Sequence, residues 1–505
     1  TINAGDGIDT LSVVDSHIAP PATNPTRTFT INAGGGNDVV SIDAVDSAFT
    51  AAVTIDGQLG VDQVTIDDPL TLGSDISTGN LEVTAESIEL NAAINTAPGT
   101  VGDIKLHVGS TLTIADAANI TAGGNVLIDG AGATTTAADV TTLGGDITIK
   151  TATTLTDSVT FDSAGGDIAF SDPAATLDGP FNLTLDADSG DVRFDGIVGG
   201  ASPLSALIDV DVTTARNVTI NEAFTAESIT HTAGTGTTTF NGSVTLSEAV
   251  GTALALNTPE VVVNAPVSSA GGEFQITTDD IDIAAALNVN GVGDRLITIV
   301  ERTADRDLEL GGNTLGRLAL DAAELALVNA ATLRFGDNLA GDLHLSAPVV
   351  ASGVTNLHLH TGGGVSGVGT ITATNLAVEA VGDVQLANAN NVQTLAIHTT
   401  GPAGEISYRD ADNFTLDDVD GVGGIDTVDG DVTLETPAQV SQAIFGSIVA
   451  RGLQLLGGSA LLDLQTNDID VLAADLDGTL DFGDTDDFKV GTVQTFGPAS
   501  VGITT

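Results

Sequence analysis

A short phrase recurs four times between Gly123 and Gly196, and it constrains the fold more than any other feature of the chain. Each copy is a turn of small residues, one polar residue and then a triplet whose outer positions are apolar. The polar residues are Asn125, Asp146, Asp167 and Asp191, so the copies lie 21, 21 and 24 residues apart. One short strand in each repeat of about 20–30 residues is typical of a solenoid, in which coils stack along one axis.

Arg193 indicates which face of these strands is buried. Residues that flank the middle of a triplet share a face, because side chains alternate along a strand. A single Arg belongs in water, which places Val192 and Phe194 inside. The sequence therefore predicts an all-β fold, a right-handed parallel β-solenoid with about 20–25 residues and three short strands per coil. The expected inward column in the earlier copies is Val126, Ile128, Ile147, Ile149, Ile168 and Phe170.

Composition agrees with thin stacked layers and excludes several partners. With 60 Gly, 3% aromatic residues and no Cys, Met or Trp, the core must consist of Val, Ile, Leu, Ala and scattered Phe. Only the stretch from Ala322 to Ala331 is compatible with a helical turn or two. The 68 acidic residues against 13 basic ones predict a surface that attracts cations and repels nucleic acid. No apolar run reaches the length of a membrane span, so we expect no membrane insertion.

Three Gly- and Asp-rich phrases near the N-terminus form a second repeat. They occupy residues 1–9, 30–38 and 54–62, end in Asp9, Asp38 and Asp62, and each leads into an alternating strand. The phrase resembles the calcium-binding nonapeptide of repeats-in-toxin proteins, although Ala4 and Ala33 replace its first Gly. That resemblance implies Asp9, Asp38 and Asp62 as calcium ligands, stacked at one corner of successive coils. The alternative is that these are ordinary turns whose Asp side chains accept backbone amides.

The C-terminal half contains sequence motifs that differ from those described so far. Residues 306–312, 331–337 and 341–346 follow one another as Asp/Glu-containing strands with Gly turns, and a phrase around Phe414 returns around Phe488, 74 residues later. This succession resembles the repeat region of filamentous-haemagglutinin-like exoproteins, the giant secreted adhesins of Gram-negative bacteria. The resemblance implies a structural shaft of an extracellular or bacterial cell-surface fibre. Its implied partners are neighbouring coils or subunits of the same fibre and host-cell or surface ligands.

We divide the chain into three sections of one continuous rod. Residues 1–66 carry the calcium-type turns, residues 67–260 are regular β-solenoid, and residues 261–505 carry the haemagglutinin-like repeats. The chain begins on a phrase, Thr1-Ile2-Asn3, that recurs at Thr30-Ile31-Asn32. We therefore expect it to be an excerpt of a longer chain.

Catalysis is the remaining alternative, because β-helices also include enzymes that degrade polysaccharides. We expect the densest carboxylate groups, at residues 279–282 and 484–487, to have no nearby Lys or Arg partner that would tune an acid, so we predict no catalytic residues and no enzyme. One Tyr and no Trp leave little for the aromatic platform of a carbohydrate-binding protein. His358 and His360 share a strand face, where they are either exposed polar positions or part of a metal site that needs a third ligand.

Overall fold

The computed structural model describes residues 1–14, 28–43, 51–73, 79–97, 101–200, 206–293, 295–402, 404–496 and 500–504. Its stacked strands are parallel and form a β-solenoid of about 20 turns, which confirms the predicted fold class. The chain groups into two compact units, Thr1–Ser247 and Glu248–Thr505. The three sections predicted from sequence character stay a prediction.

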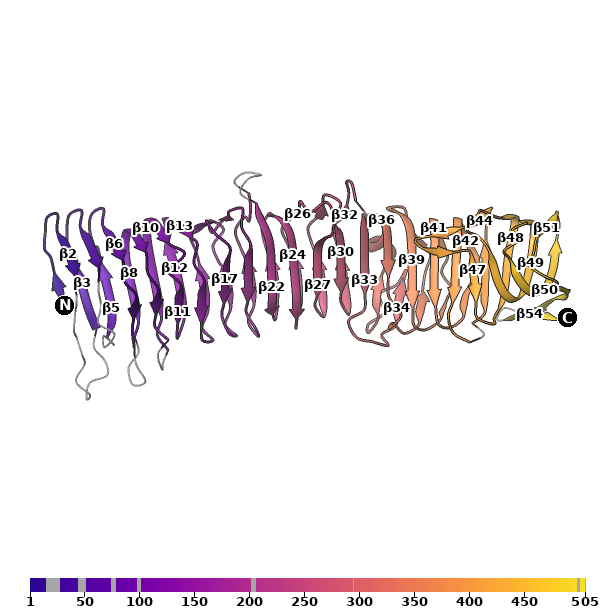
Figure 1. Ribbon diagram of the computed structural model, residues 1–505, viewed down its shortest axis with the longest axis horizontal. Helices are drawn as coiled ribbons and strands as arrows, with labels where there is room; N and C mark the ends of the chain where they lie inside the picture. Colours follow the sequence, from indigo (N-terminus) through magenta and orange to yellow (C-terminus); the bar gives the residue numbers. More distant parts are fainter. Residues whose placement is uncertain are drawn as a thin grey trace. The chain divides into compact units, whose positions relative to one another are not determined.

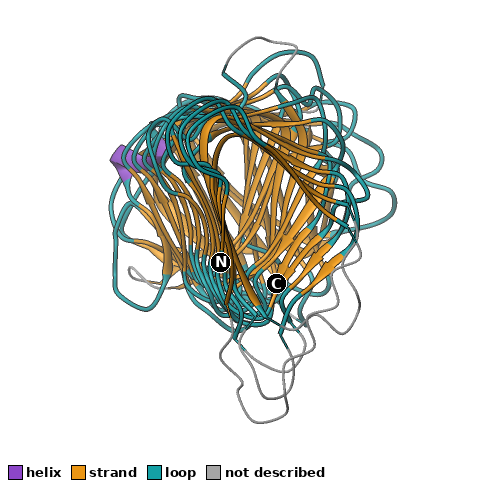
Figure 2. Cartoon of the chain, turned by 90° about the vertical axis from the view of Figure 1, so that its left-hand side faces the viewer, coloured by secondary structure: helices purple, strands orange, loops and turns teal. Residues whose placement is uncertain are grey.

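Each regular coil of the N-terminal unit contains three short strands. One coil consists of β15 (Ile147–Ile149), β16 (Ala152–Leu155) and β17 (Val159–Asp162). The next consists of β18 (Ile168–Phe170), β19 (Leu177–Asp178) and β20 (Leu183–Asp186), and each strand pairs in parallel with its counterpart. The strands form the walls of the coils and the turns form their corners (Figures 1 and 2). The three faces of this unit are therefore three parallel ladders.

The same three ladders extend through the rest of this unit. We call the faces that contain β15, β16 and β17 the first, second and third face. The first face also contains β1 (Ile2–Asn3), β3 (Thr28–Asn32), β5 (Ala52–Asp56), β8 (Leu81–Leu90), β10 (Ile104–Ile114), β12 (Val126–Gly130), β21 (Val192–Phe194), β23 (Val218–Ile220) and β25 (Thr237–Phe240). The second contains β2 (Thr10–Val13), β4 (Val39–Ile42), β6 (Gln63–Ile66), the C-terminal parts of β8 and β10, and β13 (Ala133–Thr136). The third contains β7 (Leu70–Thr71), β9 (Ile94–Asn95), β11 (Ile120–Ala122), β14 (Val140–Thr142), β22 (Leu207–Ala215) and β24 (Phe224–Gly234).

The inward column predicted from Arg193 is confirmed. Val192 and Phe194 are buried, whereas Arg193 between them is exposed. The register pairs Ile147 with Ile168 and Ile168 with Val192, so like positions stack directly. The rings of Phe170 and Phe194 stack with their centroids 5.3 Å apart. Each such ring contributes a large buried apolar area. The core of the coils is a column of stacked Val, Ile and Phe side chains.

The polar residue of each phrase also has a structural role. The side chain of one coil accepts a hydrogen bond from the backbone N–H of the equivalent residue in the next coil, as Asp146 does from Asp167 at 2.9 Å. Gly166, which precedes this position, is required because an added Cβ would overlap the carbonyl oxygen of Gly145 in the coil below. We call the series of acceptors the anchor ladder. Its members are Asn80, Asp103, Asn125, Asp146, Asp167, Asp191 and Asn217, and its seven bonds measure 2.8–3.2 Å.

The C-terminal unit is a parallel solenoid with longer and less regular coils. One ladder contains β27 (Thr252–Asn257), β30 (Glu273–Thr277), β33 (Leu296–Val300), β36 (Val328–Phe335), β39 (Val354–Thr361), β41 (Ile371–Ala380), β42 (Val384–Thr399), β47 (Ile425–Thr427), β49 (Ile448–Leu462) and β50 (Asp468–Leu476). A second contains β34 (Leu308–Leu310), β37 (Leu343–Leu345), β40 (Val365–Gly367), the N-terminal part of β42, β43 (Ile406–Asp410) and β48 (Asp431–Gln442).

The helical turn expected between Ala322 and Ala331 is present as α1 (Ala322–Leu325). Asp321 caps it by accepting from the backbone of Glu324, whose own side chain reaches back to the Asp321 backbone. This reciprocal capping box satisfies the first amides of the turn. No helix among the described residues is long and apolar enough to cross a membrane.

The 74-residue phrase is not a structural repeat. The register places Val440, Ala460 and then Leu480 over Phe414 of β44 (Phe414–Leu416), at intervals of 26, 20 and 20 residues. Phe488 lies outside the strands. Three coils therefore take 66 residues here, eight fewer than the 74 that separate the two phrases.

Candidate functional site

The structure places Asp9, Asp38 and Asp62 at one corner of three successive coils. Each lies immediately before a strand of the second face, β2, β4 or β6. The backbone N–H of Asp9 donates to Asp38 Oδ1 at 2.7 Å, and that of Asp38 donates to Asp62 Oδ1 at 2.9 Å. The three predicted site residues thus lie in one column and satisfy backbone amides, while their role as calcium ligands stays a prediction.

Glu86 continues the column, and the sequence analysis missed it. The N–H of Asp62 donates to Glu86 Oε2 at 2.9 Å. The available signal was the spacing: Glu86 follows Asp62 by the same 24 residues that separate Asp62 from Asp38, and an alternating strand comes after each. We call Asp9, Asp38, Asp62 and Glu86 the carboxylate ladder.

One oxygen of each Asp in this ladder has no hydrogen-bond partner. Asp38 and Asp62 are 1% and 2% exposed, and their Oδ2 atoms, like that of Asp9, are buried and unpaired. Burial raises the pKa of Asp62, and the negative charges of Glu86 and Asp38 add to this effect. Carboxylate oxygens are the hard ligands that Ca²⁺ prefers. The free Oδ2 atoms therefore fit a cation, which would relieve the repulsion between successive coils.

The turn carbonyls differ from the Oδ2 atoms, because they accept hydrogen bonds from neighbouring coils. The carbonyl of Gly5 accepts from the N–H of Gly35 at 3.1 Å, and that of Gly34 accepts from Leu59 at 3.1 Å. These carbonyls stack the turns, whereas each Asp carboxylate of the ladder keeps one oxygen without a hydrogen-bond partner.

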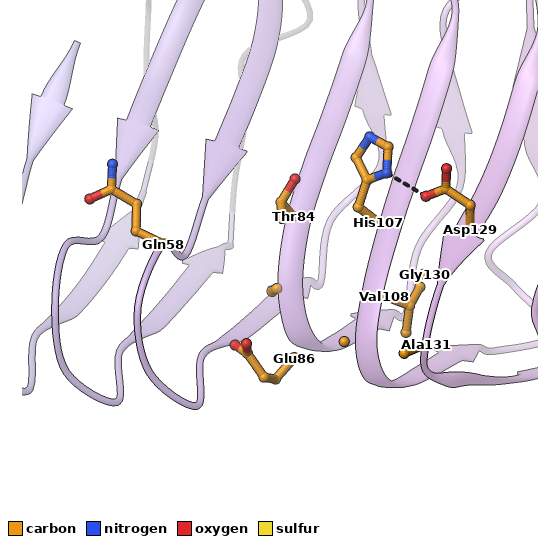
Figure 3. A pocket seen from close by; sticks show the side chains of 10 residues that line it. Gln58, Thr84, Glu86, His107, Val108, Asp129, Gly130 and Ala131 are labelled. Atoms are coloured by element: carbon orange, nitrogen blue, oxygen red, sulfur yellow. Dashed lines mark hydrogen bonds and ion pairs between the residues drawn. The ribbon is translucent and has the colours of Figure 1, made fainter.

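A surface hollow of about 240 Å³ lies beside the end of this ladder (Figure 3). Glu86, Gln58 and Thr84 line one side, and His107 and Asp129 line the other. His107 Nδ1 contacts Asp129 Oδ1, and His107 Nε2 lies 3.7 Å from a carboxylate oxygen of Glu82 on the neighbouring strand. The hollow offers acceptors to a cation or to hydroxyl groups, but none of its lining residues is Phe, Tyr or Trp.

One expectation about catalysis needs correction. Asp279 does have a basic neighbour, since Arg306 Nε lies 3.8 Å from its Oδ1. The turn after β33 brings Arg306 back toward Asp279, which sequence proximity could not reveal. Asp279 also accepts from the backbone N–H and hydroxyl of Thr303, at 2.8 and 2.6 Å. This carboxylate therefore holds the turn together.

Comparisons with known proteins found no match, so the class of this protein is assigned from its fold. No family model matches the chain, no curated protein matches it, and no solved structure matches it. The parallel stacked coils define a β-solenoid repeat protein.

Proposed function

We propose that this chain is a structural shaft of an extracellular or bacterial cell-surface fibre, of the haemagglutinin-like adhesin class. The observation that supports this most is the anchor ladder, in which seven consecutive hydrogen bonds join one coil to the next. Each such hydrogen bond contributes about 0.5–1.5 kcal/mol net to stability. The repeated polar residues therefore serve to join one coil to the next. An architecture in which each coil contacts its neighbours gains length by adding coils.

The surface chemistry supports the same role. With 68 acidic and 13 basic residues the chain carries a formal charge of −55, which keeps long molecules apart in solution. Among the described aromatic side chains, Phe445 is the one that is largely exposed, at 62%. Neighbouring coils or subunits of the fibre are the main partners in this proposal, with host-cell or surface ligands at a tip. Calcium at the carboxylate ladder would stabilise the N-terminal coils.

Coil deletion tests the shaft directly. Removing residues 147–167 takes out one whole coil in register, and we expect the shortened chain to unfold as cooperatively as the parent in urea. An out-of-register deletion of residues 147–156 is the matched control, which should not fold. If the in-register deletion also fails to fold, the coils are not interchangeable spacers and the shaft is contradicted.

Scattering and microscopy of the full chain provide the second test. A single elongated particle would support a shaft, whereas two units that move independently would contradict it. Specific binding or cleavage of a polysaccharide would favour the alternative, a carbohydrate-binding or polysaccharide-degrading β-helix protein. Detection of the protein on intact cells by surface labelling tests its proposed location.

A further inference from the structure

A short insertion interrupts one coil of the C-terminal unit. The register pairs Leu395 with Leu416 and Ile397 with Ile425. One residue separates the first members of these pairs, but eight separate Leu416 from Ile425, so seven residues are extra. They form an antiparallel hairpin of β45 (Asp418–Val419) and β46 (Val422–Gly423). We call residues 417–424 the Asp420 hairpin.

The hairpin turn has the geometry that its sequence favours. Asp420 and Gly421 have φ values of +55° and +87°. An Asp-Gly pair with two positive φ angles suits the two-residue turn whose twist matches that of the flanking strands. The turn therefore holds the Asp420 side chain at a fixed position on the hairpin tip.

Apolar contacts dock the hairpin on the outer face of the coils. Val419 and Val422, 2% and 3% exposed, form a buried cluster with Ala377 and Ala396. These two alanines are neighbours in the ladder of β41 and β42, and their small side chains leave room for the valines. His398 Nε2 also lies 3.0 Å from the Gly423 carbonyl oxygen. The hairpin thus covers an outer surface that is open to solvent in a regular coil.

The docked tip places Asp420 between two basic residues. Arg334 Nε and Nη2 lie 2.7 and 3.0 Å from the two carboxylate oxygens of Asp420, a bidentate pair. His358 Nδ1 lies 2.8 Å from Asp420 Oδ2. Arg334 and His358 are partners in the ladder of β36 and β39, so Asp420 bridges two adjacent coils. With Nδ1 turned to Asp420, the Nε2 atom of His358 points the other way.

A second carboxylate and a second histidine converge on that Nε2 atom. Glu379 Oε2 lies 3.0 Å from His358 Nε2 and 3.9 Å from His360 Nδ1. Among the described residues, His358, His360 and Glu379 are the group of three whose ligand atoms all lie within 4.8 Å of one another. Metal–ligand bonds of about 2.0–2.1 Å place the ligand atoms of a tetrahedral site about 3.4 Å apart, within the range seen here.

We propose that His358, His360 and Glu379 bind a divalent transition-metal ion, zinc by chemical preference, and that Asp420 is a positioning residue for His358. Two imidazoles and one carboxylate are a known zinc ligand set, and imidazole nitrogen selects against calcium. A carboxylate that accepts from the far ring nitrogen fixes the tautomer and orientation of a metal-binding histidine. The ion takes the place of a proton between His358 Nε2 and Glu379. Its fourth position is left to water or to an external ligand.

Calorimetric titration of the chelator-treated full chain with zinc chloride, in millimolar calcium to occupy other carboxylates, tests the site. We expect one equivalent of zinc to bind, and cobalt(II) in its place to give the intense visible absorption of a tetrahedral nitrogen–oxygen site. Glu379→Gln keeps the size of a side chain that is 30% exposed and should remove both signals. The matched control is His344→Gln, which alters a histidine outside the cluster and should leave both signals unchanged.

The positioning role has its own readout. Asp420→Asn should weaken zinc binding about 10–100-fold and shift the cobalt spectrum, while one equivalent still binds. Circular dichroism of each variant checks that the fold is retained. Absence of stoichiometric zinc binding by the parent would overturn the proposal. So would binding that survives Glu379→Gln but is lost in an Asp38→Asn/Asp62→Asn variant, since the ion would then belong to the carboxylate ladder. An Asp420→Asn variant with unchanged affinity and spectrum would refute the positioning role.

Discussion

Asp62 in the carboxylate ladder and Asp420 on the hairpin are both shielded from water, yet their pKa values move in opposite directions. Burial raises the pKa of Asp62, and the adjacent carboxylate of Glu86 adds to the rise. Burial acts on Asp420 in the same sense, but hydrogen bonds from Arg334 and His358 outweigh it, and the pKa of Asp420 is lowered. Burial therefore acts in the same direction at both sites, and the opposite charge environments decide the direction of each pKa shift.

This difference follows from how each site is built. A regular repeat places like residues over like, so the neighbours of a carboxylate in the ladder are other carboxylates. The Asp420 hairpin breaks the repeat and reaches across two coils, which brings a carboxylate to residues 62 and 86 positions away. Repetition suits stacking, and interruption of the repeat allows unlike groups to meet.

The largest expected effect distinguishes a glycine that packs against the neighbouring coil, Gly166, from one with open space around it, Gly421. In Gly166→Ala the new Cβ meets the backbone oxygen of Gly145, which cannot move without disturbing the stack. We expect a loss of about 3 kcal/mol in the free energy of unfolding, measured in urea by circular dichroism. The matched variant Gly421→Ala meets no atom within 4 Å and has only its positive φ to strain it, so about 1 kcal/mol is expected. Equal losses in the two variants would show that turn stacking is not what requires Gly166.

A buried carboxylate among other carboxylates should make stability fall as the pH rises. Burial raises the pKa of Glu301 to about 8, and the nearby charges of Asp337 and Asp279 act in the same direction. Between its ordinary value of 4.5 and about 8, folded Glu301 holds a proton that the unfolded chain has lost, so stability decreases through this window. Glu301→Gln should match the parent near pH 4 and be about 2–3 kcal/mol more stable above pH 8.

The control for this pH series is a carboxylate with a cation beside it. The guanidinium of Arg216 lowers the pKa of Asp191, so its contribution is present above the ordinary value of 3.8 and is lost as the pH falls. Asp191→Asn should therefore be less stable than the parent at neutral pH, with the difference vanishing in acid. Glu301→Gln and parent curves that run parallel from pH 4 to 9 would contradict the assignment of Glu301.

Removal of the hairpin carboxylate should destabilise the chain by a smaller amount. Asp420→Asn leaves Arg334 and His358 facing an amide, and we expect a loss of about 2 kcal/mol at pH 7 with chelator present. The value lies below that of a fully buried pair because the Arg334 side chain is 43% exposed. A double-mutant cycle with Arg334→Gln measures the pair itself. Additive losses would mean that the bidentate contact contributes nothing.

Calcium should give the smallest effect. If the free Oδ2 atoms of Asp38 and Asp62 hold the ion weakly, millimolar calcium at a few times its dissociation constant stabilises the chain by about 1 kcal/mol. Asp38→Asn/Asp62→Asn should abolish the calcium-dependent shift in the urea midpoint. The matched control Asp146→Asn, in the anchor ladder, should retain it. A shift of equal size in all three proteins would indicate general screening of the acidic surface.

The sequence alone was sufficient for the coil, its phase and its stacking residues. The alternation around Arg193 correctly placed Val192 and Phe194 inside, and the spacing of the polar residues located four of the seven members of the anchor ladder, although their hydrogen bonds to the next coil came from the structure. The stacking of Asp9, Asp38 and Asp62 was also readable. Local periodicity carries this information, because identical positions of neighbouring coils must face each other in a parallel ladder.

The histidine cluster was decided by the tertiary structure. His358 and His360 were visible as neighbours on one strand face, but Glu379 became their companion only through the register of β39 and β41. The Asp-Gly turn of the hairpin could be recognised in the sequence. The place where the hairpin packs on the coils, and hence the position of Asp420, could not. Where an insertion packs depends on which outer side chains leave room for it, here Ala377 and Ala396, and no period along the chain encodes that choice.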